Sequence, residues 1–216
     1  MTPRLVTEFI GTFVLVATVG LTVLQESAFA PLAIGSALMI AVYMGGHISG
    51  GHYNPAVTLG VWLRGKLDAG MVLPYMLAQL AGAAVAALLV QGLIGQTFVP
   101  APGGASSTLV ALAAELVFTF MLVLVVLNVA TDEATAGNSY YGLAIGFTVV
   151  VGAFAVGAIS GGAFNPAVGL GPAIVHGIAG GPVGHVWLYL VGPLLGGALA
   201  ASVYRLQHPI PRATMA

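Results

Sequence analysis

The sequence predicts an all-α membrane protein with six transmembrane helices and two re-entrant half-helices. Composition is the first reason: 59% of the 216 residues are hydrophobic and 5% are charged, whereas soluble chains carry about 25% charged residues. Such a chain cannot cover its surface with polar groups. The second reason is a set of six long apolar runs. The third is a short motif, Gly-Gly-x-x-Asn-Pro-Ala-Val, which occurs at 50–57 and again at 161–168.

Each copy of the motif predicts an irregular glycine-rich segment that turns into a helix. Asn is a favoured helix N-cap and Pro is a favoured first helical residue, so we expect short helices over 55–63 and 166–175. About ten residues at ~1.5 Å each span roughly 15 Å, half of a bilayer core of about 30 Å. Two half-helices that enter from opposite faces would meet at their capping residues, Asn54 and Asn165.

The six apolar runs are each long enough to cross a bilayer. They cover about 5–24, 31–48, 71–94, 109–130, 140–159 and 185–204. The first run resembles a signal peptide, because Arg4 precedes it and Ala28-Phe29-Ala30 resembles a cleavage site. Its length, its internal Glu8 and its counterpart later in the chain favour a span instead.

The basic residues support the re-entrant segments independently of the motif. All five Lys and Arg residues lie at positions 4, 64, 66, 205 and 212. With six full spans they share one face, which the positive-inside rule assigns to the cytoplasm. If one half-helix were counted as a full span, Arg205 and Arg212 would lie on the opposite side of the membrane from Arg4. We therefore expect cytoplasmic termini and, from the short plain tails, a prokaryotic plasma-membrane protein.

The two halves of the chain also match outside the motif. Residues 8–13 (Glu-Phe-Ile-Gly-Thr-Phe) parallel residues 115–120 (Glu-Leu-Val-Phe-Thr-Phe). We expect a single domain of two repeats, about 1–100 and about 105–212, each with three spans and a half-helix after its second span. Because three is odd, the second repeat is inserted upside down, an arrangement typical of transport proteins.

The segments before each half-helix are expected to line a water-filled path, because non-helical backbone at membrane depth is tolerated only there or inside protein. Their free carbonyls would form two ladders of acceptors, and the Asn amides would donate into the path at its midpoint. The positive half-helix N-termini would disfavour cations. The predicted backbone residues are Gly50, Gly51, His52, Tyr53, Gly161, Ala163 and Phe164.

Glu8 and Glu115 are the carboxylates that fall well inside predicted spans. An intramembrane carboxylate is a functional candidate, and proton coupling through these two would make the protein a secondary transporter. The alternative is a structural, buried role in which each Glu accepts hydrogen bonds from the loop of its own repeat. Their symmetric placement favours the structural role, since a coupling site usually needs one special position.

The remaining residues predict no metal site, cofactor, nucleic-acid partner or enzyme chemistry. The chain has no Cys, and we interpret His47 and His52 as holding the first loop, because no Asp, Glu or Cys lies nearby. Several side chains near helix ends are expected at the membrane interface: His176, His185, His208, Trp62, Trp187 and Tyr189. Four glycines are expected to let helices approach closely: Gly82, Gly192, Gly196 and Gly197.

Taken together, these residues resemble the aquaporin, or major intrinsic protein, family over essentially the whole chain. The motifs that carry the resemblance are Glu8-Phe-Ile-Gly-Thr, the segment 47–57, Ala78-Gln-Leu-Ala-Gly82, Asn165-Pro-Ala and Gly192-Pro-Leu-Leu-Gly-Gly. The resemblance implies a right-handed six-helix bundle, a homotetramer with one pore per subunit and passive flow without a cofactor. It assigns the pore centre to Asn54, Pro55, Ala56, Asn165, Pro166 and Ala167.

The resemblance also implies an outer selectivity filter, and here the chain departs from the family. Most members have Arg directly after the second Asn-Pro-Ala, where this chain has Val168. By spacing, its partners are Ile34, Ala153 and Gly162, a smaller set without side-chain donors, so the constriction should be wider. Gly169 stands where glycerol facilitators usually have Asp and is typical of water channels.

We therefore expect a passive channel for water and small uncharged solutes such as glycerol, urea or undissociated metalloid acids. The alternatives are a water-selective channel and a proton-coupled transporter that uses Glu8 and Glu115. A closed structural protein of membrane junctions has less support.

Overall fold

The computed structural model describes residues 1–209. The expected end of the second repeat and Arg212 lie outside these residues. The helices are α1 (Thr2–Leu24), α2 (Ala30–Ser49), α3 (Pro55–Leu63), α4 (Ala69–Ile94), α5 (Thr108–Ala130), η1 (Glu133–Thr135), α6 (Tyr141–Ser160), α7 (Pro166–Ile178) and α8 (Leu188–Gln207). Within the described residues, six helices (α1, α2, α4, α5, α6 and α8) are long and apolar enough to cross a membrane.

The six predicted spans and both half-helices are confirmed, with shifts of a few residues at some ends. The helix α7 runs to Ile178 rather than Val175, because Gly177 is accommodated inside it and the left-handed Gly180 (φ 84°) follows its end. The helix α8 begins at Leu188, and turn bonds such as Leu188 N–H to His185 O (3.0 Å) precede it.

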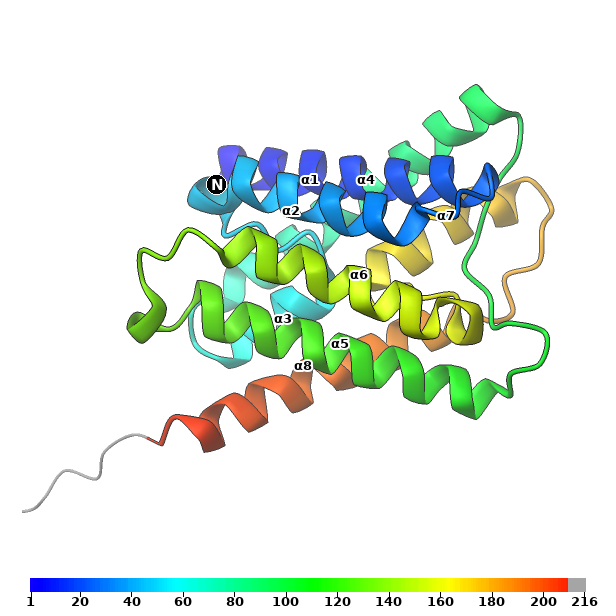
Figure 1. Ribbon diagram of the computed structural model, residues 1–216. Helices are drawn as coiled ribbons and strands as arrows, with labels where there is room; N and C mark the ends of the chain where they lie inside the picture. Colours follow the sequence, from blue (N-terminus) through cyan, green and yellow to red (C-terminus); the bar gives the residue numbers. More distant parts are fainter. Residues whose placement is uncertain (210–216) are drawn as a thin grey trace, which may run out of the picture.

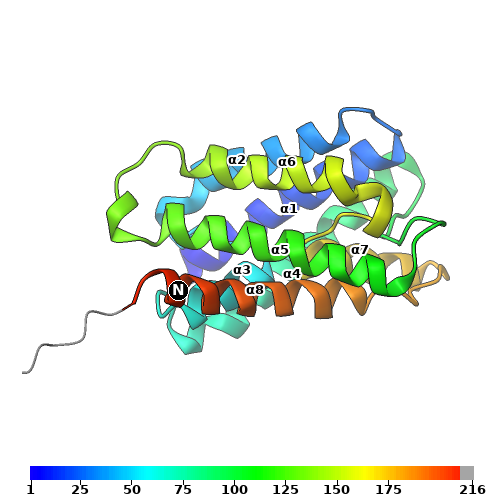
Figure 2. The same cartoon turned by 60° about the horizontal axis from the view of Figure 1, so that its bottom comes forward.

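The helices pack as two equivalent sets. In the first, α1 packs against α2 and α4; in the second, α5 packs against α6 and α8. The contact between α2 and α6 joins the sets, while α3 packs against α8 and α7 packs against α4. Figures 1 and 2 show α3 and α7 enclosed by the long helices, and Figure 1 shows that the N-terminus and the end of α8 lie at the same end of the bundle. This is the predicted architecture of two inverted repeats.

Close helix approach at the four predicted glycines is confirmed. A Cβ at Gly82 in α4 would lie 2.3 Å from the carbonyl oxygen of Phe9 in α1. A Cβ at Gly196 in α8 would lie 2.5 Å from the carbonyl oxygen of Leu116 in α5. The other two, Gly192 and Gly197, would meet Glu115 Cβ at 2.9 Å and Ala56 O at 2.6 Å. Each repeat therefore brings two helix backbones close together at an equivalent position.

A cluster at the inner end of the bundle, the end that holds the N-terminus and the end of α8, connects three segments. Tyr204 in α8 donates a hydrogen bond to Asp132 after α5, and Arg64 after α3 donates to the Tyr204 hydroxyl at 3.0 Å. The Arg64 guanidinium lies over the Tyr204 ring, 4.5 Å from its centroid. His208, expected at the interface, lies 3.1 Å from the Asp132 carboxylate and stacks on Tyr204.

Stability at acid pH should depend on Asp132. The Tyr204 hydroxyl, the Ala134 N–H, His208 and Arg64 favour its ionised form and lower its pKa. A lowered folded-state pKa contributes stability above the ordinary aspartate range, near 3.9, which is lost as pH falls through the folded-state value. We therefore expect thermal unfolding in detergent to show an acid-side loss of stability below about pH 4. The loss should be smaller in Asp132→Asn, and identical acid profiles for the two proteins would contradict this role.

Candidate functional site

The two motif asparagines meet at the centre of the bundle and cap the half-helices, as predicted. Asn54 Oδ1 accepts the Ala56 N–H at 2.8 Å, and Asn165 Oδ1 accepts the Ala167 N–H at 2.9 Å. Each asparagine also reaches across to the other repeat: Asn54 Nδ2 donates to Phe164 O and Asn165 Nδ2 donates to Tyr53 O, both at 2.9 Å. Both are 3% exposed. An amide NH₂ carries two donor protons, so one proton per asparagine remains for the path.

The loops before the half-helices follow the same backbone course in both repeats. Each passes through two left-handed glycines, Gly50 and Gly51 or Gly161 and Gly162, and places an aromatic residue at positive φ. Tyr53 has φ 49° and Phe164 has φ 48°. Positive φ is strained for a bulky residue and persists where the surroundings fix it. These conformations turn the two carbonyls toward the facing asparagines.

The buried glutamates fix these conformations. Glu8 accepts the Tyr53 N–H at 2.7 Å and the His52 N–H at 3.0 Å. Glu115 accepts the Phe164 N–H at 2.6 Å and the Ala163 N–H at 3.0 Å. Both carboxylates are 0% exposed. Two further hydroxyl bonds complete the pattern, from Ser49 to Glu8 (2.7 Å) and from Ser160 to Glu115 (2.8 Å).

Two tyrosines that anchor the loops have roles that the sequence reading missed. Tyr75 donates to Ser49 O at 2.8 Å, and Tyr189 donates to Ser160 O at 2.5 Å. The interfacial role predicted for Tyr189 is wrong, because its side chain is 1% exposed. The usable signal was spacing: each tyrosine stands seven residues before a close-packing glycine, Gly82 or Gly196.

The first loop has a polar network that the second lacks. Gln79 Nε2 donates to Glu8 at 2.8 Å and to Thr58 Oγ1 at 2.9 Å. His52 Nδ1 lies 3.1 Å from the same Thr58 hydroxyl, and its ring stacks on Tyr75. The side chain of His52 thus contacts Thr58 and Tyr75. The backbone N–H of His52 donates to Glu8.

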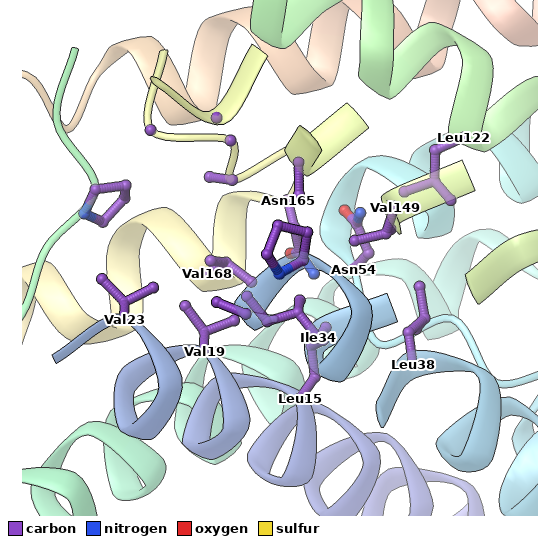
Figure 3. A pocket seen from close by; sticks show the side chains of 18 of the residues that line it. Leu15, Val19, Val23, Ile34, Leu38, Asn54, Leu122, Val149, Asn165 and Val168 are labelled. Atoms are coloured by element: carbon purple, nitrogen blue, oxygen red, sulfur yellow. The ribbon is translucent and has the colours of Figure 1, made fainter. Parts of the chain in front are cut away.

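A cavity of about 480 Å³ leads from the outer end of the bundle, opposite the inner end, to the asparagine pair. Its lining includes all four predicted filter residues, Ile34, Ala153, Gly162 and Val168. Figure 3 shows Ile34 and Val168 near Asn165, with the apolar side chains of the long helices around them. His52, Asn54 and Asn165 are its only lining residues with polar side chains in the described part of the chain.

The predicted backbone residues divide between this cavity and the inner end. Gly51, His52, Gly161 and Ala163 line the outer cavity, and Gly50 lines an inner cavity of about 410 Å³. Tyr53 and Phe164 do not line the three described cavities. The carbonyls of these two residues accept bonds from the facing asparagines, and their place in the pore-lining backbone stays a prediction.

The wall of the inner cavity carries polar and charged side chains. Its lining includes Arg4, His47, Lys66 and Thr131. His52 and Val126 line both this cavity and the outer one, so the two cavities approach each other at these residues. His47, expected to hold the first loop, lies in the wall of the inner cavity.

Comparisons with known proteins agree with this architecture. The family model "Major intrinsic protein" matches residues 1–204. The chain is 37% identical to aquaporin NIP1-4 of Oryza sativa subsp. japonica over 213 residues, which is 94% of this chain and 76% of that protein. It is 36% identical to glycerol uptake facilitator protein-like 6 of Lactiplantibacillus plantarum, covering 92% of this chain and 95% of that protein.

A solved structure matches as well. The aquaglyceroporin from Plasmodium falciparum superimposes with a TM-score of 0.83 at 27% identity, over 94% of this chain and 95% of that one. With a family match over nearly the whole chain and the same fold in a solved relative, the chain belongs to the major intrinsic protein family.

Proposed function

We propose that this protein is a passive transmembrane channel for water and small uncharged solutes. The observation that carries the proposal is the asparagine pair at the end of a cavity of about 480 Å³ whose described lining has no charged side chain. The names of its relatives support it, since they include an aquaporin, a glycerol uptake facilitator and an aquaglyceroporin. It is a channel rather than an enzyme.

In this proposal a solute loses its hydrogen bonds to water as it enters and forms hydrogen bonds to protein groups that line the path. Loop carbonyls such as that of Gly162 accept from it, and the remaining amide protons of Asn54 and Asn165 donate to it at the midpoint. The N-termini of α3 and α7 carry partial positive charge there, which disfavours cations.

Ile34, Ala153, Gly162 and Val168 form the filter in this proposal. These side chains are small and lack donors, so the filter admits glycerol, urea and undissociated metalloid acids beside water. Gly169 gives no support to a water-selective pore, because a Cβ there would lie 2.3 Å from Tyr189 Cβ. The packing of Tyr189 therefore explains this glycine without reference to the solute.

The position of the glutamates favours a channel over a proton-coupled transporter. Neither Glu8 nor Glu115 lines any of the three described cavities. Their carboxylates are occupied by loop N–H groups and by the hydroxyls of Ser49 and Ser160. This supports the structural role for both.

The assembly and placement complete the proposal. The protein forms a homotetramer in the plasma membrane, each subunit being one channel domain of two repeats, about 1–100 and about 105–212. Its termini face the cytoplasm. The described basic residues support this orientation: Arg4 and Lys66 line one inner cavity, and Arg64 contacts Tyr204 at the end of α8.

The test is glycerol entry into liposomes that contain the protein, followed by stopped-flow light scattering. Wild type should admit glycerol fast, and Val168→Arg should slow it by about tenfold or more, because a long cation then fills the filter. Water permeability of the same vesicles controls for insertion, and Val168→Ile controls for a change of side chain without charge. Rapid water permeation without glycerol entry in the wild type would show that the pore is narrow at a place other than the filter.

A further inference from the structure

We propose that the inner cavity binds a phosphate monoester of a small polyol, and that the bound ester slows flux through the pore. The binding site goes beyond the proposed function, while the effect on flux rests on that function. The proposal comes from how charged groups are distributed at the inner end of the bundle and from the place where the inner cavity meets the outer one.

Three basic side chains from three separate segments line the inner cavity. Arg4 belongs to the first turn of α1, His47 to the last turn of α2, and Lys66 to the turn after α3. The first turn of α1 adds partial positive charge at this end, because its N-cap makes no side-chain hydrogen bond. The volume of about 410 Å³ is within the range of about 300–1,000 Å³ that is usual for small-molecule sites.

Within the described residues, no carboxylate lines this cavity. Asp132 and Glu133 line a neighbouring cavity of about 430 Å³. Glu133 lies 3.8 Å from Lys66 but is 93% exposed, so solvent screens this pair. Glu8 holds the loop that forms part of the wall, and its oxygens accept four hydrogen bonds. Two ion pairs occur in residues 1–209, and Arg4 takes part in neither.

The other two described Lys and Arg residues are engaged elsewhere. Arg64 donates to the hydroxyl of Tyr204, and Arg205 donates to Leu63 O. Neither arginine lines the inner cavity. The positive-inside rule requires only that cations lie on the cytoplasmic face, so it does not explain why the remaining two line one cavity. Two cations without a carboxylate suit a phosphate monoester, which carries about −1.5 to −2 charges at pH 7 and three acceptor oxygens.

Other groups of the lining suit the organic part of the ester. The last carbonyls of a helix have no intrahelical partners, and the lining includes His47, Ile48 and Gly50 at the C-terminal end of α2. Such carbonyls can accept hydrogen bonds from the hydroxyl groups of a polyol. Val61 and Leu67 add apolar surface for its carbon chain. Inorganic phosphate can use the cations but not these further groups.

The position of the cavity connects binding to flux. His52 and Val126 line both the inner and the outer cavity. A ligand in the inner cavity therefore occupies the approach to the asparagine pair from the inner side. We expect solute flux to fall as this site fills.

Binding is measured as the rise of the thermal unfolding midpoint with the concentration of glycerol 3-phosphate, on the full chain in an uncharged detergent. We expect saturation with an apparent Kd of about 1 mM. Arg4→Gln and Lys66→Gln should each weaken binding by about tenfold, because each removes a hydrogen bond to the charged phosphate. Both side chains are exposed, so both variants should fold.

Arg205→Gln is the matched control. It removes the same charge from the same end of the bundle, on a side chain that does not line the cavity, and it should change the affinity by less than about twofold because salt screens distant charges. Inorganic phosphate should bind more weakly than the ester. Glycerol, and sodium chloride of matched ionic strength, should cause no saturable shift. Absence of saturable binding, or equal weakening by all three variants, overturns the proposal.

Flux is measured as urea entry into proteoliposomes of neutral lipid with the ester on both sides. Wild-type flux should fall by about half at the concentration that half-saturates the site, and Lys66→Gln should need about tenfold more ester for the same effect. Unchanged flux with a filled site overturns the effect on flux. Normal binding in a protein that conducts neither water nor urea overturns the proposed function and leaves the site standing.

The phosphate group could come from a soluble ester or from a lipid headgroup, and a further arm separates the two sources. Vesicles that contain phosphatidic acid present the same phosphate monoester on a lipid. Unchanged urea flux in these vesicles without soluble ester supports the soluble source. Slower flux that Lys66→Gln relieves supports the site and assigns the lipid headgroup as its occupant.

Discussion

Glu115→Gln is expected to cause a large loss of the protein's stability. Glu115 accepts the N–H groups of Ala163 and Phe164, and Phe164 is held at positive φ. A glutamine keeps one acceptor and presents its own donors to the remaining N–H. Hydrogen bonds to a charged group contribute about 1.5–3 kcal/mol each, so the loss should be roughly 3 kcal/mol or more. That is a large share of a typical stability of about 5–15 kcal/mol.

The measurement is the thermal unfolding midpoint in detergent together with the yield of monodisperse protein. Ser160→Ala removes one bond to the same carboxylate and should have a smaller effect, about 1 kcal/mol. Glu133→Gln, at a side chain that is 93% exposed, should leave the midpoint unchanged. A Glu115→Gln protein of normal stability whose solute flux had lost its dependence on a proton gradient would instead favour the transporter.

Gly82→Ala is the second large effect that we expect. The new Cβ would lie 2.3 Å from the Phe9 carbonyl oxygen, a backbone atom that cannot rotate away. The helices α1 and α4 must then separate where Glu8 and Gln79 form their hydrogen bond. Overpacking of this kind costs about 1–3 kcal/mol, and more where backbone is involved, so we expect a loss of about 3 kcal/mol and a lower yield of folded protein.

Gly92→Ala is the matched control for this prediction. Gly92 lies in the same helix, and a Cβ there meets nothing within 4 Å. The same chemical change should therefore be neutral or stabilising by up to about 1 kcal/mol, because Ala favours helix over Gly. Equal unfolding midpoints for the two variants would show that the contact between α1 and α4 is not tight.

The local features of this protein could be predicted because each depends on neighbours in the sequence. The ends of α3 follow from an Asn cap, a first-turn Pro and the Arg64-Gly65 break, and all three act within a few residues. The six spans follow from the length of each apolar run. The repeat could be detected because Glu8 and Glu115 stand in matching surroundings, and each does hold a loop.

The resemblance, rather than the physics of the sequence, supplied the filter residues. Ile34 and Ala153 are ordinary apolar residues of a span, and nothing in their local pattern separates them from lipid-facing neighbours. The structure places both in the wall of the outer cavity.

Contacts between residues distant in the sequence were decided by the tertiary structure. Tyr189 is near the start of its span, which predicts an interfacial position, yet it is buried against Ser160, 29 residues away. The asparagine amides were expected to face the path, yet each gives one proton to the opposite loop, 110 and 112 residues away. The sequence determined which segments lie in the membrane, because burial in lipid depends on local composition. Only the fold determined which polar groups remain free inside it, because a buried donor takes whichever acceptor the packing of distant segments brings near.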